Sequence, residues 1–553
     1  MTPRFNPIPH VHPPALLRLV ESLGPPRPAT PWDQTVERLL NGVRDPHLYL
    51  GRSLADRVPW LLQRELLTAH AHLLGGSRSG KTSLGLISLV AQLVAHGDSS
   101  VVVIDAKADN ALFWSTFVEA TRSGLPFKWF TLQPGAASFA FNPFGQWFDR
   151  HRSVNARSQS HLTALDLYFG EAYGKGFFGT VSLDTFSRFL THFRDVNSFA
   201  DLSRYTEEPG SFAATHTDAD DSKHLRMVLR QLAAVRPLNL TERTRPAVAP
   251  AVLDHAIDMS DVVTRPQVVY FSLASLEDSL TAKSVGKLAL YAAVQAAAVM
   301  RRLGPGVPVY LILDEFQQLV AHNVKILLEM ARAVGVHLVL SHQDVSQLKT
   351  EEFDIASTIE SSTTLKMVFE ASSSAGLRYM QETGGEVRER TLNWMQALPA
   401  GFDEANDAHL SPEFALPRFP FELPTASVGE QVRPRLTTNE ILAHSAHPLR
   451  GFARSRADSG LTQYQGQWTA VEFEYPTTAK EYKDRSSTPL PTEHPSCVTV
   501  TDTPDDPEPN KTLSNKPLPV PKPPRSADRA IADRLKALND AIRKRPAAGA
   551  GGQ

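Results

Sequence analysis

The stretch HLLGGSRSGKTSLGLISLV, His72 to Val90, joins an apolar run, a glycine-flanked polar loop and a helical pattern. The loop satisfies the pattern G-x-x-x-x-G-K-[ST], in which glycines let backbone N–H groups turn toward phosphates. The lysine of this pattern reaches the β- and γ-phosphates, and the Ser/Thr hydroxyl binds Mg²⁺. The predicted nucleotide-binding residues are Gly75, Gly76, Ser77, Arg78, Ser79, Gly80, Lys81, Thr82 and Ser83. Among them, Lys81 is also a candidate catalytic residue and Thr82 a candidate metal ligand.

A second motif fits the same chemistry. The run VYLILDEF, Val309 to Phe316, predicts a strand that ends in two carboxylates. Alone, such an ending is common; beside a phosphate-binding loop it predicts that Asp314 binds Mg²⁺ and that Glu315 is the base that activates water.

Two further candidates follow in the chain. The run VHLVLSHQ ends at Gln343, whose amide could sense the γ-phosphate or orient water, or could simply cap the strand. Between the two strands, LLEMARAVGV carries Arg332. This arginine could reach the γ-phosphate of a neighbouring subunit as an arginine finger, or it could be an ordinary exposed helix residue.

The nucleotide class follows from motifs that the sequence lacks. It contains no Asn-Lys-x-Asp guanine-reading motif and no Leu-Ser-Gly-Gly-Gln motif. A signalling GTPase and a transporter ATPase are therefore disfavoured, and ATP with Mg²⁺ is the expected ligand pair.

Strand-like and helical segments alternate along the core, which predicts an α/β fold with a mostly parallel sheet covered on both faces. Between 151 and 245 only helical patterns occur, and Pro-rich composition marks both ends of the chain. The predicted units are a loosely ordered Pro-rich segment at 1–45, a nucleotide-binding domain at 46–150 and 246–400, an all-α insertion at 151–245, a small C-terminal region at 401–476, and a disordered tail at 477–553 that ends in a basic helix at about 526–544.

Composition limits the partners and the compartment. Across 553 residues the net charge is -2, so any nucleic-acid contact must be local. The single cysteine, Cys497, excludes a disulfide framework and favours a reducing compartment. The N-terminus lacks a signal peptide, and the apolar run Leu288 to Met300 is too short to span a bilayer. We therefore expect a soluble cytoplasmic protein without an integral membrane segment.

The order of these elements resembles the type IV coupling proteins of conjugation and type IV secretion, within the FtsK-HerA translocase superfamily. The similarity covers about residues 48 to 395. Its motifs are HAHLLGGSRSGKT, the segment Asp105-Ala106-Lys107-Ala108-Asp109, FNPFGQ, LILDEF, MARAVGVHL and VLSHQDVSQL. The chain departs from the family at Ala106 and Ala108, where Pro and Gly are usual, and at Arg78, where Gly is usual. From this sequence we expect no counterpart of the family's N-terminal transmembrane anchor.

The resemblance implies a RecA-like P-loop NTPase that acts as an ATP-dependent DNA translocase or coupling ATPase. It further implies a ring, expected to be a hexamer, that moves single- or double-stranded DNA or a nucleoprotein. Relaxase or secretion-channel proteins would be its partners, and the protein would be cytoplasmic and docked peripherally on a membrane complex. Two alternatives stay open: an ATP-gated receptor or scaffold for protein substrates, and a HerA-like repair or defence ATPase.

Overall fold

The computed structural model describes ten stretches of the chain: 12–24, 30–42, 47–167, 175–192, 198–207, 223–319, 324–349, 354–395, 425–455 and 466–501. None of the helices in these stretches is both long and apolar enough to cross a membrane.

An 11-stranded sheet forms the centre of the fold, in the order β2-β1-β14-β13-β10-β3-β9-β8-β4-β7-β5. The pairs from β10 to β5 are all parallel, and those from β2 to β10 are antiparallel. The strands are β1 (His47–Ser53), β2 (Pro59–Gln63), β3 (Ala71–Leu74), β4 (Ser100–Asp105), β5 (Phe127–Thr131), β7 (Val268–Ser272), β8 (Val309–Asp314), β9 (Val336–His342), β10 (Leu365–Val368), β13 (Arg450–Ser455) and β14 (Thr469–Glu472). The predicted mostly parallel α/β fold is confirmed.

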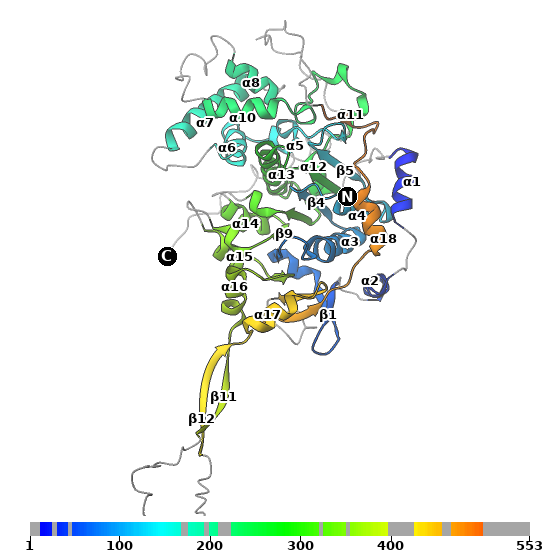
Figure 1. The fold of residues 1–553 in the computed structure, drawn as a ribbon. Helices are drawn as coiled ribbons and strands as arrows, with labels where there is room; N and C mark the ends of the chain where they lie inside the picture. Colours follow the sequence, from blue (N-terminus) through cyan, green and yellow to red (C-terminus); the bar gives the residue numbers. More distant parts are fainter. Residues whose placement is uncertain are drawn as a thin grey trace, which may run out of the picture.

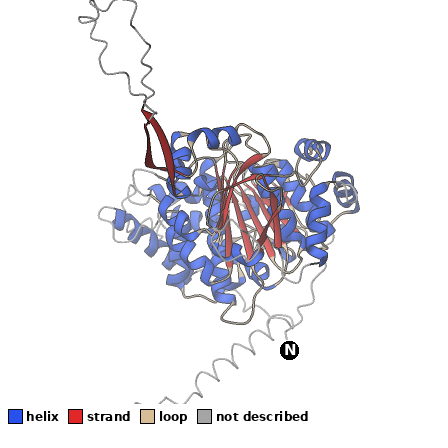
Figure 2. Cartoon of the chain, turned by 90° about the horizontal axis from the view of Figure 1, so that it is seen from below, coloured by secondary structure: helices blue, strands red, loops and turns tan. Residues whose placement is uncertain are grey.

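Helices cover both faces of the sheet, so the central strands are buried on each side (Figure 2). One layer contains α3 (Ile87–Ala95) and α4 (Asn110–Arg122), and the other contains α13 (Ser279–Met300) and α14 (Val324–Ala333) (Figure 1). In α13, a Cβ at Gly286 would lie 2.7 Å from Leu319 and 3.1 Å from Leu273. The absence of a side chain there lets α13 pack closely on the sheet. The shorter helices α15 (Ala356–Ser362) and α16 (Ser374–Gly384) flank β10 in the chain.

Residues 151–245 contain only helices and turns wherever the structure describes them. These helices are α6 (Val154–Ala164), α7 (Lys175–His192), α8 (Phe199–Glu207) and α10 (Lys223–Ala233), and they follow the short α5 (Trp147–Arg150). They gather above α13 in the view of Figure 1, and α6 contacts that helix. Two short helices, α11 (Pro250–Asp254) and α12 (Met259–Thr264), lead back to β7. The described part of 151–245 is therefore helical, and its status as a separate inserted domain stays a prediction.

The N-terminal segment is not loosely ordered throughout, which corrects the prediction for 1–45. It forms α1 (Pro14–Leu23) and α2 (Pro31–Gly42). Leu16, Val20 and Leu23 of α1 are buried in the main core. Each helix begins with a proline, a position where the missing N–H costs nothing because no helical carbonyl would accept from it.

The predicted disordered tail is wrong for residues 477–501. This stretch contains α18 (Ala479–Ser487), which packs on α4, and β15 (Val498–Thr499), which pairs with β6 (Ala137–Ser138). The buried Arg485 side chain donates hydrogen bonds to the Leu23 carbonyl (3.1 Å) and to Ser115 Oγ (3.0 Å). These long-range contacts order a segment whose composition alone indicates disorder. The predicted basic helix at 526–544 lies outside the described residues.

Two strands of the predicted small C-terminal region, β13 and β14, belong to the central sheet. The same region contributes α17 (Thr438–Ser445) and β12 (Thr425–Pro434). β12 pairs along its length with β11 (Glu386–Met395), and this two-stranded ribbon projects away from the body of the protein (Figure 1).

Candidate nucleotide-binding site

The phosphate-binding loop lies between β3 and a π-helical turn, Lys81–Leu86, that continues into α3. Gly80 has a φ of 89°, a left-handed conformation that favours glycine. Arg78 also has a positive φ, 67°, which is a strained conformation for a residue with a side chain. Glycine, which the resemblance implies at this position, would adopt this conformation without that strain.

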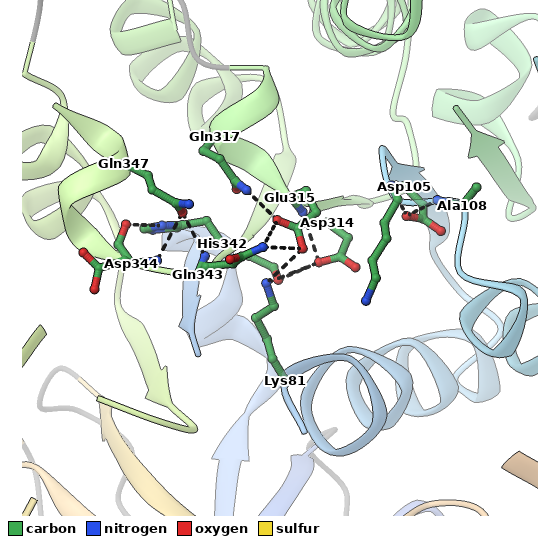
Figure 3. A network of polar contacts seen from close by, with 12 residues as sticks. Lys81, Asp105, Ala108, Asp314, Glu315, Gln317, His342, Gln343, Asp344 and Gln347 are labelled. Atoms are coloured by element: carbon green, nitrogen blue, oxygen red, sulfur yellow. Dashed lines mark hydrogen bonds and ion pairs between the residues drawn. The ribbon is translucent and has the colours of Figure 1, made fainter. Parts of the chain in front are cut away.

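The loop lysine points toward the two carboxylates predicted to act with it (Figure 3). Lys81 Nζ is 3.8 Å from Asp314 Oδ1 and 3.7 Å from Glu315 Oε1. The parallel pairing of β3, β9 and β8 produces this arrangement, because the C-terminal ends of all three strands meet at one edge of the sheet. The buried Nζ has no hydrogen-bond partner within the described structure. It is therefore available to donate to phosphate oxygens.

Asp314 offers a buried carboxylate oxygen that could hold a metal ion. Its Oδ1 accepts hydrogen bonds from Ser341 Oγ (2.9 Å) and from the Glu315 amide (3.0 Å), but its buried Oδ2 has no partner among the described residues. Burial raises the pKa of Asp314, the charge of Lys81 lowers it, and the charge of Glu315 raises it again. A hard divalent cation suits such an oxygen. Thr82, half-buried and next to Lys81, is the second predicted ligand.

Glu315 is oriented by two amide side chains. Gln343 Nε2 lies 3.2 Å and 3.4 Å from its two carboxylate oxygens, and Gln317 Nε2 donates to one of them. Glu315 has a φ of 55°, so the chain turns sharply at the end of β8. Strain of this kind is typical of residues whose side chain must point into a site. The structure thus brings Gln343 into the cluster with Lys81, Asp314 and Glu315.

Asp105 is a buried neighbour of the cluster to which the sequence assigns no role. Its carboxylate accepts hydrogen bonds from the amides of Lys107 (2.8 Å), Ala108 (3.0 Å) and Asp109 (2.6 Å), and from the Tyr270 hydroxyl (2.6 Å). Burial, followed by the charge of the paired Asp314, raises its pKa to about 7. The sequence signal for this residue was its position at the end of a buried strand, where a polar segment begins.

A histidine pair beside the loop was also not predicted. His72 Nε2 lies 2.6 Å from His342 Nε2, and their rings stack at 4.8 Å. Burial and then the charge of Lys81 lower the pKa of His342 to about 3, so the pair is uncharged at neutral pH. It joins β3, which enters the loop, to β9, which leads to Gln343.

Arg332 does not reach the site in its own chain. It is exposed in the last turn of α14, just before β9 begins, whereas Gln343 follows the other end of β9. Its charge acts on His70, which precedes β3; burial is the main cause of the lowered pKa of this histidine. Arg332 therefore lies at the opposite edge of the sheet from Lys81.

Comparisons with known proteins agree with this architecture. Residues 308–397 match the family model described as the TraM recognition site of TraD and TraG. No curated protein matches the chain. The solved structure of the bacterial conjugative coupling protein TrwBdeltaN70, in its unbound form, has a TM-score of 0.53 at 13% identity and covers 81% of this chain and 92% of its own.

A second solved structure is the plasmid coupling protein TrwB in complex with the non-hydrolysable ATP analogue ADPNP. It has a TM-score of 0.50 at 12% identity and covers 85% of this chain and 95% of its own. At such identities the likeness concerns the fold. The fold, the family model and the order of the motifs together confirm that this chain resembles the coupling proteins of bacterial conjugation.

Proposed function

We propose that the chain is an ATP- and Mg²⁺-dependent motor that forms a ring, expected to be a hexamer. It would move DNA or a nucleoprotein cargo in conjugative transfer or type IV secretion. The observation that carries this proposal is the cluster of Lys81, Asp314, Glu315 and Gln343 at one edge of the sheet. A phosphate-binding loop beside an oriented base is typical of enzymes that hydrolyse nucleoside triphosphates.

Each residue of the cluster has a role that its surroundings support. The ammonium of Lys81, which has no hydrogen-bond partner among the described residues, would bind the β- and γ-phosphates. Asp314 and Thr82 would hold Mg²⁺, which when bound neutralises charge on the phosphates. Glu315, held by Gln343 and a second amide, would take the proton of the attacking water.

Arg332 would act only on the site of a neighbouring copy. Its exposure, and its place at the edge opposite the cluster, support a finger that works in trans. Nucleotide hydrolysis would then depend on assembly. This dependence would couple each hydrolysis step to the contact between two subunits.

DNA would be held through the phosphodiester backbone by local Lys and Arg side chains, since the net charge of -2 supplies no general attraction. We place the protein in the cytoplasm, docked peripherally on a membrane complex with relaxase or secretion-channel partners. This placement rests on the resemblance to coupling proteins.

A second function, reception of a protein partner, is favoured by the family model. The matched residues, 308–397, belong to a region described as a recognition site for TraM in TraD and TraG. In this chain the stretch runs from β8 through β11, one strand of the projecting ribbon. Protein recognition and DNA movement are compatible in one coupling ATPase.

The test is steady-state ATP hydrolysis by the purified chain, without DNA and with single-stranded or duplex DNA. We expect DNA to stimulate hydrolysis at least about tenfold, and Lys81→Ala to abolish both basal and stimulated rates. The form of DNA that activates better identifies the track. Hydrolysis that is indifferent to all DNA would refute the motor and favour the protein receptor.

A further inference from the structure

His342 ends β9 and lies between the two residues that bond to the carboxylates of the nucleotide site. Ser341 Oγ donates to Asp314 Oδ1 (2.9 Å), and Gln343 Nε2 lies 3.2 Å from Glu315 Oε2. Successive side chains of a strand point to opposite faces of the sheet, so the His342 ring lies on the other face of β9 from Ser341. A shift of His342 would move both neighbours, because they are joined to it in the chain.

His342 is also bonded to the strand that enters the phosphate-binding loop. The amide of Gly75, the first residue of the loop, donates to the His342 carbonyl (3.3 Å). His342 Nε2 lies 2.6 Å from Nε2 of His72 in β3. Both rings are buried. The backbone and the side chain of His342 therefore both hold β9 against the base of the loop.

The contacts of the two rings determine which nitrogens carry hydrogen. His342 Nδ1 lies 3.0 Å from the Asp344 carbonyl oxygen, which can only accept, so this nitrogen is the donor. Burial is the main cause that lowers the pKa of each ring, so both are neutral at pH 7. A neutral imidazole carries one N–H, so His342 Nε2 accepts and His72 Nε2 donates. The pair thus forms a directed chain from His72 through His342 to the Asp344 carbonyl.

The bond to the Asp344 carbonyl spans the residue that contacts the base. Gln343 lies between His342 and Asp344 in the chain, so the bond closes the backbone around it. The Gln347 side-chain oxygen accepts from the amides of Gln343 and Asp344, at 3.2 Å each (Figure 3). These bonds hold the backbone on both sides of Gln343. Its side-chain amide is thereby aimed at Glu315.

A role in packing alone does not account for this histidine pair. His72 Nδ1 is buried and has no hydrogen-bond partner among the described residues. A buried acceptor without a partner destabilises a fold, and apolar side chains would fill the same space without that cost. What the pair supplies, and apolar side chains cannot, is a set of directional bonds. Its contribution is therefore to geometry.

We propose that His342 is a positioning residue for nucleotide hydrolysis. Its bond to His72 holds the phosphate-binding loop, and its bond to the Asp344 carbonyl holds the turn of Gln343. The loop and the turn are thereby fixed relative to each other, so that Gln343 keeps the Glu315 carboxylate aimed at the attacking water. This role rests on the proposed function, because it requires that Glu315 is the base.

Three variants of the full chain test the two side-chain bonds. His342→Leu removes both. His342→Asn keeps a donor near the position of Nδ1, and His342→Gln keeps a polar group near the position of Nε2. We expect the single-turnover rate of ATP hydrolysis to fall about 10- to 100-fold in His342→Leu, since a small misplacement near the reacting atoms has effects of this size. The other two variants should have intermediate rates, and equal rates for all three would overturn the proposal.

Nucleotide binding should change much less than the rate. We expect the Kd of His342→Leu for a fluorescent ATP analogue to stay within about threefold of the wild type, because the phosphates are bound by the loop and by Lys81. A loss of binding as large as the loss of rate would show that the loop itself has collapsed. That result would overturn a positioning role.

A double-mutant cycle shows whether His342 acts through Gln343. Gln343→Ala should lower the rate, and His342→Leu should then have no more than about a twofold further effect, because residues that act as a unit are not additive. A merely structural role would lower the rate by the same factor in both backgrounds. Such additivity, or a wild-type rate in Gln343→Ala, would refute the proposal. If His342→Leu does not fold, His342→Asn and His342→Gln replace it in the cycle.

The matched control is His337→Leu. His337 is also buried in β9, near the end of the strand that lies away from the loop. Its replacement should lower Tm and leave the rate unchanged. Rates are measured well below the Tm of each variant, so that folded molecules are compared. A rate in His337→Leu as low as in His342→Leu would refute the proposal, because any buried histidine of the strand would then have the same effect.

The same samples separate this role from the proposed motor. If DNA stimulates hydrolysis and the cycle is additive, the positioning role is refuted and the motor stands. If DNA never stimulates hydrolysis but the basal rates are non-additive as expected, the motor is refuted and the positioning role stands. If the wild type binds the analogue and does not hydrolyse ATP, both are refuted.

Discussion

Replacement of Glu315 by glutamine should stop hydrolysis and leave nucleotide binding intact. The side chain is buried, two amides orient it, and it lies 3.7 Å from Lys81 Nζ. Glutamine keeps the shape of this side chain and loses its basicity. General base catalysis contributes about 10²- to 10⁴-fold to a rate. We therefore expect kcat to fall by about that factor, a rise of about 2.7–5.4 kcal/mol in the barrier at 1.36 kcal/mol per tenfold.

Binding should be unchanged or tighter in Glu315→Gln, because the site loses one negative charge beside Lys81 and attracts an anionic nucleotide more strongly. The assay combines single-turnover ATP hydrolysis with titration of a fluorescent ATP analogue. Glu370→Gln is the matched control. This carboxylate lies beside Gly76 of the phosphate-binding loop but forms no described ion pair with Lys81. A Glu315→Gln rate within about threefold of wild type would refute the assignment of the base.

Three further changes test other parts of the structure. Lys81→Ala should weaken binding of a fluorescent ATP analogue by at least about tenfold, because the phosphates lose a charge-assisted donor. Burial, before any neighbouring charge, lowers the pKa of His12 and of His494 to about 4 from 6.5, so their contribution to stability is complete above pH 6.5 and is lost as the pH falls toward 4. His494→Phe should therefore flatten the decline in Tm over that range. Gly451→Ala should lower the free energy of urea unfolding by about 1–3 kcal/mol, since its Cβ would meet a carbonyl of strand β10, whereas Gly304→Ala, in open space, should not.

The local part of the site could be predicted from the sequence. The loop from Gly75 to Thr82, the pair Asp314 and Glu315, and Gln343 each end or follow a short buried strand, and parallel strands bring their C-terminal ends to one edge. Proximity of these side chains follows from that rule alone. Their chemical roles stay predictions that the kinetic experiments test.

The contacts between side chains on neighbouring strands of the site could not be predicted in this way. The contact between His72 and His342 depends on the register of β3 with β9, which places residues from distant parts of the chain side by side. The position of Asp105 opposite Asp314 depends likewise on the register of β4 with β8. Register is a property of the assembled sheet, so a single sequence gives no direct sign of it.

Composition misled the prediction at both ends of the chain for a related reason. Prolines and polar residues indicate that a segment buries little apolar surface by itself. They do not indicate whether another part of the same chain packs against the segment. α1 and α18 pack on α4 and against each other, and Arg485 of α18 bonds to the end of α1. Each of these two helices therefore packs against the other. The composition of either segment alone gives no sign of this packing.

The C-terminal strands explain why the loop is held in place from both sides. β3, which enters the loop, pairs with β9 on one side and with β10 on the other, and β10 in turn pairs with β13. The turn before β13 approaches the loop, since the Pro448 carbonyl would lie 3.8 Å from a Cβ at Gly80. A region with no recognisable chemistry in the sequence therefore lies beside the loop. Because a buried strand edge without a partner would leave its backbone groups unpaired, β13 supplies the partner that the free edge of β10 needs.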